Sequence, residues 1–161
     1  MRVFGKKIDY WKEKYGGVAW GFILSTLVFL LSPELSNWKE FVRGIPTIGM
    51  LIFGFLLTFL GIILQGRSET IEWMKSRDVL FQRFISFHRR IVIVSITLSV
   101  YAFFIAYFNF EWLINSIFTD YLCLWIVVQK LLISVFVFLS VWFLYDVMHF
   151  INIFYLLIKK N

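Results

Sequence analysis

Long uncharged runs of apolar residues alternate along the chain with short segments that carry most of the charge. Residues 16–33, 45–65 and 91–110 contain no Asp, Glu, Lys, Arg or His. A helix needs roughly 20 apolar residues to cross about 30 Å of hydrocarbon. Because each run is close to that length, we predict three membrane-spanning helices at these positions.

The fourth apolar region is longer than one span and is interrupted by Lys130, Asp146 and His149. A charge at the bilayer centre costs at least about 2.5 kcal/mol, whereas a long charged side chain near the interface can reach water. Placing Lys130 at one interface and Asp146 with His149 at the other predicts a span at 129–149. The alternative register, 122–144, buries Lys130.

Between the second and third spans, residues 68–90 place apolar side chains near helical spacing with charged residues between them. This pattern predicts an amphipathic cytoplasmic helix. It could lie on anionic lipid at the membrane surface, or it could dock a cytosolic partner or another copy of the chain. The basic residues that would bind lipid or a partner are Lys75, Arg77, Arg83, Arg89 and Arg90.

The distribution of Lys and Arg predicts the orientation, because cytoplasmic flanks of membrane spans are enriched in both. All of these residues except Lys39, Arg43 and Lys130 fall on one side of the predicted membrane, in the N-terminal segment, residues 68–90 and the tail at 150–161. The chain is therefore expected to be an all-α integral membrane protein, a single polytopic domain over residues 1–161. It has four transmembrane helices, a cytoplasmic amphipathic helix, and both termini in the cytoplasm.

The first span also follows a basic segment, as the apolar region of a cleaved signal peptide does. No Ala-x-Ala-like cleavage site ends this apolar run, which closes with Leu31, Ser32 and Pro33. The first span is therefore interpreted as a membrane anchor.

Each of the first three spans carries a stripe of small or short polar residues along one face. In lipid, such residues let two helix backbones approach closely. We therefore expect the first three spans to pack on one another, and the bulky fourth span to face lipid or another protomer. Alternatively, some of the second stripe lines a pore in an oligomer. The three stripes are Gly17, Gly21 and Ser25; Thr47, Gly54, Thr58, Gly61 and Gln65; and Ser95, Ser99, Ala102 and Ala106.

Composition supports the membrane interpretation and excludes several classes of function. Of 161 residues, 60% are hydrophobic and 16% charged, outside the usual range of soluble domains. The net charge of +6 lies beside apolar runs, which favours anionic lipid over nucleic acid as the partner. One Cys and two His leave no ligand set for a zinc site, and no nucleophile has a base nearby. We expect no metal, no cofactor and no enzymatic activity.

Asp146 and His149 lie one helical turn apart near the inner end of the fourth span. A carboxylate beside an imidazole in a membrane could act as a gate or proton sensor, or could be an ordinary interfacial hydrogen-bonded pair. The apolar tail that follows, 150–158, needs a covering surface. It is expected to contact residues 68–90 or a neighbouring protomer, which predicts a homo-oligomer.

Together these features predict a homo-oligomeric protein of the bacterial inner membrane that forms or gates a pore. The alternative is a membrane anchor or sensor subunit that binds a cytosolic effector. In the layout of its chain, the protein resembles small prokaryotic membrane components of antiviral systems, in which a short four-span protein works beside a cytosolic partner. This resemblance implies a role in antiviral defence and a cytosolic protein partner.

Overall fold

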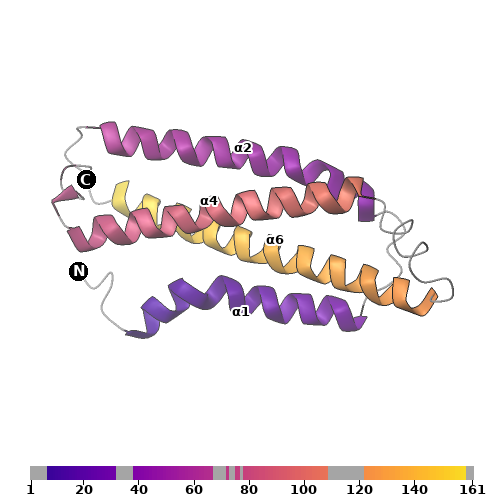
Figure 1. The fold of residues 1–161 in the computed structure, drawn as a ribbon. Coiled ribbons are helices and arrows are strands. Elements are labelled where there is room, and N and C mark those ends of the chain that lie inside the picture. The colour runs from indigo at the N-terminus through magenta and orange to yellow at the C-terminus, as the bar shows by residue number, and fades with distance from the viewer. Residues whose placement is uncertain are drawn as a thin grey trace.

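Four helices make up the part of the chain that can be described (Figure 1). The computed structural model describes residues 7–31, 38–66, 72, 75–76, 78–108 and 122–158. The helices are α1 (Lys7–Leu31), α2 (Trp38–Gln65), α4 (Asp78–Tyr107) and α6 (Leu122–Ile158). Each contains a segment long and apolar enough to cross a membrane: Lys14–Leu31, Val42–Ile63, Phe84–Tyr107 and Ile126–Asn152. The prediction of four helices of spanning length is confirmed.

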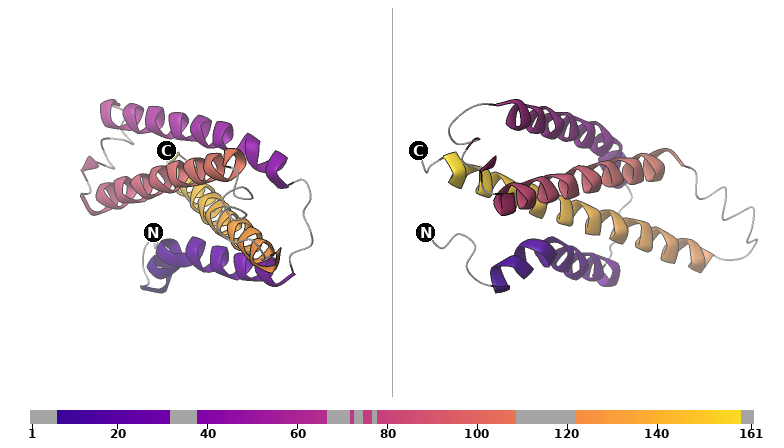
Figure 2. Two further views of the ribbon diagram at one scale, coloured as in Figure 1. Left: turned by 45° about the vertical axis from the view of Figure 1, so that its right-hand side comes forward. Right: turned by 60° about the vertical axis from the view of Figure 1, so that its left-hand side comes forward.

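The helices pack as a row in the order α1, α6, α4, α2 (Figures 1 and 2). Each helix runs antiparallel to its neighbours in the row. As a result, α1 begins at the same end of the molecule at which α6 ends, and α2 ends and α4 begins there as well. We call this end of the molecule the terminal end.

This order contradicts the expectation that the first three spans pack on one another while the fourth faces lipid. The main contact of α1 is with α6, which lies between α1 and α4. A Cβ added to Gly17 would come within 2.7 Å of Cδ1 of Trp142, and one on Gly21 within 2.9 Å of the main-chain oxygen of Phe138. Close approach needs small residues on only one of two helices. The bulky side chains of α6 therefore do not indicate that α6 faces lipid.

The helices are longer than the predicted spans. α4 begins at Asp78, so residues 78–90 of the predicted amphipathic helix form one helix with the third span, whereas Ser76 lies in a turn before it. α6 is continuous over 37 residues, about 55 Å at 1.5 Å per residue, and no break marks either end of the predicted 129–149 span. α2 begins at Trp38 and includes Pro46, whose missing N–H the helix tolerates.

The core lies where α4 contacts its two neighbours. Ile91, Ala102 and Ile105 of α4 are completely buried. Towards the terminal end, the ring of Phe150 lies 5.5 Å from that of Phe84 and 5.7 Å from that of Phe59, measured between centroids. Phe150, the first residue of the apolar tail, is thus covered by α4 and α2 of the same chain. Its contact with Phe84 agrees with the predicted contact between the tail and residues 68–90.

Candidate functional site

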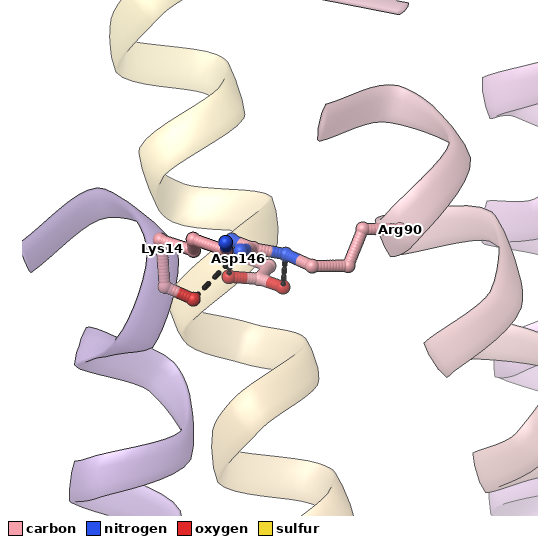
Figure 3. Close-up of polar contacts among 3 residues, drawn as sticks. All are labelled: Lys14, Arg90 and Asp146. Carbon is pink, nitrogen blue, oxygen red and sulfur yellow. Dashed lines mark hydrogen bonds and ion pairs between the residues drawn. The ribbon is translucent and has the colours of Figure 1, made fainter. Parts of the chain in front are cut away.

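An ion pair joins α4 to α6 inside the apolar part of the molecule (Figure 3). Nε of Arg90 donates a hydrogen bond of 2.9 Å to Oδ2 of Asp146, and Nη2 donates one of 2.7 Å to Oδ1. Asp146 is completely buried, and the Arg90 side chain is 23% exposed. The planar guanidinium matches a carboxylate in this two-bond geometry, which makes it one of the stronger polar contacts that proteins form.

Arg90 also reaches the third helix of the junction. Its Nη1 donates a 2.8 Å hydrogen bond to the main-chain oxygen of Lys14 in α1. The guanidinium carbon lies 4.5 Å from the centroid of the Phe87 ring, within range of a cation–π interaction. One side chain therefore connects α1, α4 and α6. We call Arg90, Asp146 and the Lys14 carbonyl the clasp.

Two adjacent glycines allow α1 to approach the clasp. A Cβ added to Gly17 would lie 3.3 Å from Oδ1 of Asp146, and one on Gly16 would overlap the hydroxyl of Tyr145. Side chains at these positions would push α1 away from α6. Because Gly16 and Gly17 have no side chains, α1 comes close enough to α6 for the Lys14 carbonyl to reach Arg90.

The two residues predicted as a gate or proton sensor have different surroundings. Both carboxylate oxygens of Asp146 accept hydrogen bonds from Arg90. The ring of His149 lies edge-on to that of Phe87, with 5.6 Å between centroids, and Phe87 also contacts the Arg90 guanidinium. His149 therefore lies beside the clasp. A sensing role for the two residues stays a prediction.

Sequence reasoning missed the pairing of Arg90 with Asp146. Arg90 was expected to bind lipid or a partner, and the nearest candidate contact for Asp146 was His149. A signal was nevertheless present, because Asp146 is the only acid within the four predicted spans. A buried acid in a membrane span needs a counter-charge at the same depth, and Arg90 directly precedes the third span.

A second feature lies on the face of α2 that points away from α4. We call Gly44, Thr47, Gly54, Thr58, Gly61 and Gln65 the outer α2 face. Among the described residues, a Cβ on Gly44, Gly54 or Gly61 would meet nothing within 4 Å. On the opposite face, Gly49 contacts α4, and a Cβ there would overlap Oγ of Ser99. The glycines of the predicted α2 stripe thus make no close contact with another helix in the part of the chain that the structure describes.

The remaining predicted packing residues lie at contacts between helices. Gly17, Gly21 and Ser25 are buried on α1, and Ser95, Ser99, Ala102 and Ala106 are buried on α4. Oγ of Ser95 donates to the Gly49 carbonyl at 3.1 Å, and Nε2 of His88 lies 2.8 Å from the Leu56 carbonyl oxygen, so α4 is bonded to α2 at two levels. On its other side, the Tyr101 hydroxyl donates to the Leu132 carbonyl of α6 at 3.0 Å.

Of the other basic residues predicted to bind lipid or a partner, the structure describes the side chains of Lys75 and Arg89, and neither forms the Arg90–Asp146 ion pair. Nζ of Lys75 donates to the main-chain oxygen of Gly66 at 3.3 Å, and Arg89 is exposed. Arg77 and the side chain of Arg83 lie outside the described residues. Within the described residues, no three His, Cys, Asp or Glu side chains gather where they could hold a metal ion.

The chain matches no protein-family model, no curated protein and no solved structure. Its function is therefore inferred from the clasp and the outer α2 face.

Proposed function

We propose that this protein is a homo-oligomeric, multi-pass protein of the bacterial inner membrane, in which α2 helices from neighbouring copies meet through their outer faces and line a pore. Both termini lie in the cytoplasm in this proposal, so the terminal end faces inward. The observation that carries the proposal is the open, small and polar surface of α2 opposite α4.

The other exposed faces, including the surface of α2 beside this stripe at Phe55, have the bulky side chains expected of a lipid-facing surface. On α1 these include Trp20, Phe22 and Leu30, each more than half exposed, and on α4 they include Phe103. Glycines on a lipid-facing surface expose backbone without adding apolar contact. Small residues at such a surface instead favour close packing of helices. A neighbouring helix is therefore the better match for the outer α2 face.

The spacing of this face fits packing between identical helices. From Gly44 to Gln65 its residues are separated alternately by three and four positions once Leu51 is included, which is a repeat of 3.5 residues. Helices with this repeat pack along a continuous seam at a shallow crossing angle. Leu51 is the large residue in the seam and is 71% exposed.

The same residues could line a water-filled path between several copies. Thr47, Thr58 and Gln65 supply hydroxyl and amide groups, and all three are exposed. Leu51, between the two threonines, would form a dewetted constriction of the kind that closes pores. The oligomer would thus combine a polar lining with an apolar gate.

Ion flux into liposomes tests the pore. Thr58→Trp places a large ring in the proposed lining, and we expect it to lower the flux at least tenfold. Thr97→Trp is the matched control, because Thr97 of α4 is also exposed and also donates to the carbonyl four residues earlier, as Thr58 does. No permeation by the native protein under any trigger would contradict the proposal.

The second candidate is a membrane anchor or sensor subunit that binds a cytosolic effector in a prokaryotic antiviral system. It is favoured by the extension of α4 beyond its apolar segment as far as Asp78, and by the exposure of Arg89 near the start of that segment. Under this alternative, Arg89→Glu abolishes co-purification of a cytosolic protein while the liposomes show no flux in any state.

A further inference from the structure

We propose that the Arg90–Asp146 ion pair is a latch that fixes a hinge in α1 at Gly16 and Gly17. The latch sets the angle at which residues 7–15 leave the four-helix row. This inference concerns how α1 is held by α4 and α6, and it does not depend on whether α2 lines a pore.

Residues 7–15 and the remainder of α1 have different directions and different surroundings. The first turns of α1 diverge from the axis of the rest of the helix (Figures 1 and 2). The apolar segment of α1 begins only at Lys14. Glycine is the poorest helix former after proline, and sharp bends in helices are commonly found at glycine. The adjacent Gly16 and Gly17 are therefore the point at which α1 bends most easily.

The clasp connects the two sides of this hinge. Before the hinge, the Lys14 carbonyl accepts a hydrogen bond from Nη1 of Arg90. At the hinge, Gly17 lies against Oδ1 of Asp146, which accepts from Nη2 of the same guanidinium. Because one rigid group forms both bonds, it holds the segment before the hinge in a fixed orientation to α6, the helix on which the rest of α1 packs.

Apolar packing holds the two sides of the hinge unequally. Beyond the hinge, Gly21 and Ser25 are buried where α1 meets α6. Before it, Trp11 is 60% exposed and Tyr15 is 42% exposed, and their rings stack on each other with 4.9 Å between centroids. The hydrogen bond from Arg90 therefore acts on a segment whose described side chains are largely exposed. Without it, residues 7–15 can swing while the rest of α1 stays on α6.

Two spin-label distances in lipid nanodiscs test the latch, in a background with Cys123→Ser. Labels at Trp11 and Leu131 report on the segment before the hinge, and labels at Leu30 and Met148 report on α1 beyond it. All four positions are exposed. We expect Asp146→Asn and Arg90→Gln each to widen the Trp11–Leu131 distance distribution at least twofold, and to leave the Leu30–Met148 distribution unchanged.

Two further variants complete the test. Arg89→Gln removes an exposed charge next to the clasp, and we expect it to change neither distribution. The double variant Arg90→Gln with Asp146→Asn is expected to be no wider than the single variants, because the two residues act as one unit. An unchanged Trp11–Leu131 distribution in the single variants, equal widening of both distances, or additive widening in the double variant would overturn the latch.

Discussion

At the scale of single residues, the clasp shows how a buried charge is accommodated. Asp146 is completely buried, and both of its oxygens are bonded to Arg90. The i, i+3 spacing of Asp146 and His149 could be found in the sequence because it is local. The pairing with Arg90 joins residues 56 positions apart, and it depends on α4 and α6 being neighbours. The chemical need for a counter-charge could be predicted, and its depth indicated a basic residue at the end of a span, but only the packing of α4 against α6 selects Arg90.

Removal of one partner should therefore destabilise the protein strongly. Asp146→Ala leaves the Arg90 guanidinium without its carboxylate, and breaking a buried pair in this way costs about 3–5 kcal/mol. Arg89→Ala removes an exposed charge from the neighbouring position and should change stability by less than about 0.5 kcal/mol. Thermal unfolding in mild detergent measures both changes. Similar melting temperatures for the two variants would mean that the clasp contributes nothing beyond surface charge.

At the scale of the helix, run lengths predicted the elements, and small residues predicted the crowded faces of α1 and α4 but not that of α2. The bilayer fixes the length of a spanning segment, so four helices of that length could be derived from the sequence. A small residue indicates close approach without identifying the partner. For this reason the α1 stripe could not reveal that it contacts Phe138 and Trp142 of α6. Likewise, the α2 stripe could not reveal that it lies on the face of α2 that points away from α4.

The two faces of α2 should respond differently to the same substitution. Gly49→Leu would drive a side chain into Ser99 and break the hydrogen bond from Ser95, so we expect loss of folded protein through overpacking, at about 1–3 kcal/mol or more. Gly54→Leu meets no other side chain among the described residues, so the monomer should fold normally but fail to assemble. Size-exclusion chromatography with native mass spectrometry separates these outcomes. A fully assembled Gly54→Leu protein would show that this glycine does not lie at a subunit contact.

At the scale of the whole molecule, the row of helices leaves α1 and α2 at its two edges. The clasp lies on the α1 side of the row, and the open glycines lie on the α2 side. A row with a small, polar outer edge is suited to assembly through that edge. This arrangement could not be predicted from the sequence, because it depends on the packing order of helices that have similar length and composition.

Cysteine cross-linking in native membranes tests assembly through the outer α2 face most directly. In a Cys123→Ser background, Thr58→Cys should form a disulfide-linked dimer rapidly on mild oxidation, because equivalent residues of two copies meet along the seam. Thr97→Cys, equally exposed but on α4, should stay monomeric under the same conditions. Absence of a Thr58→Cys dimer, or equal cross-linking at both positions, would contradict the proposed assembly.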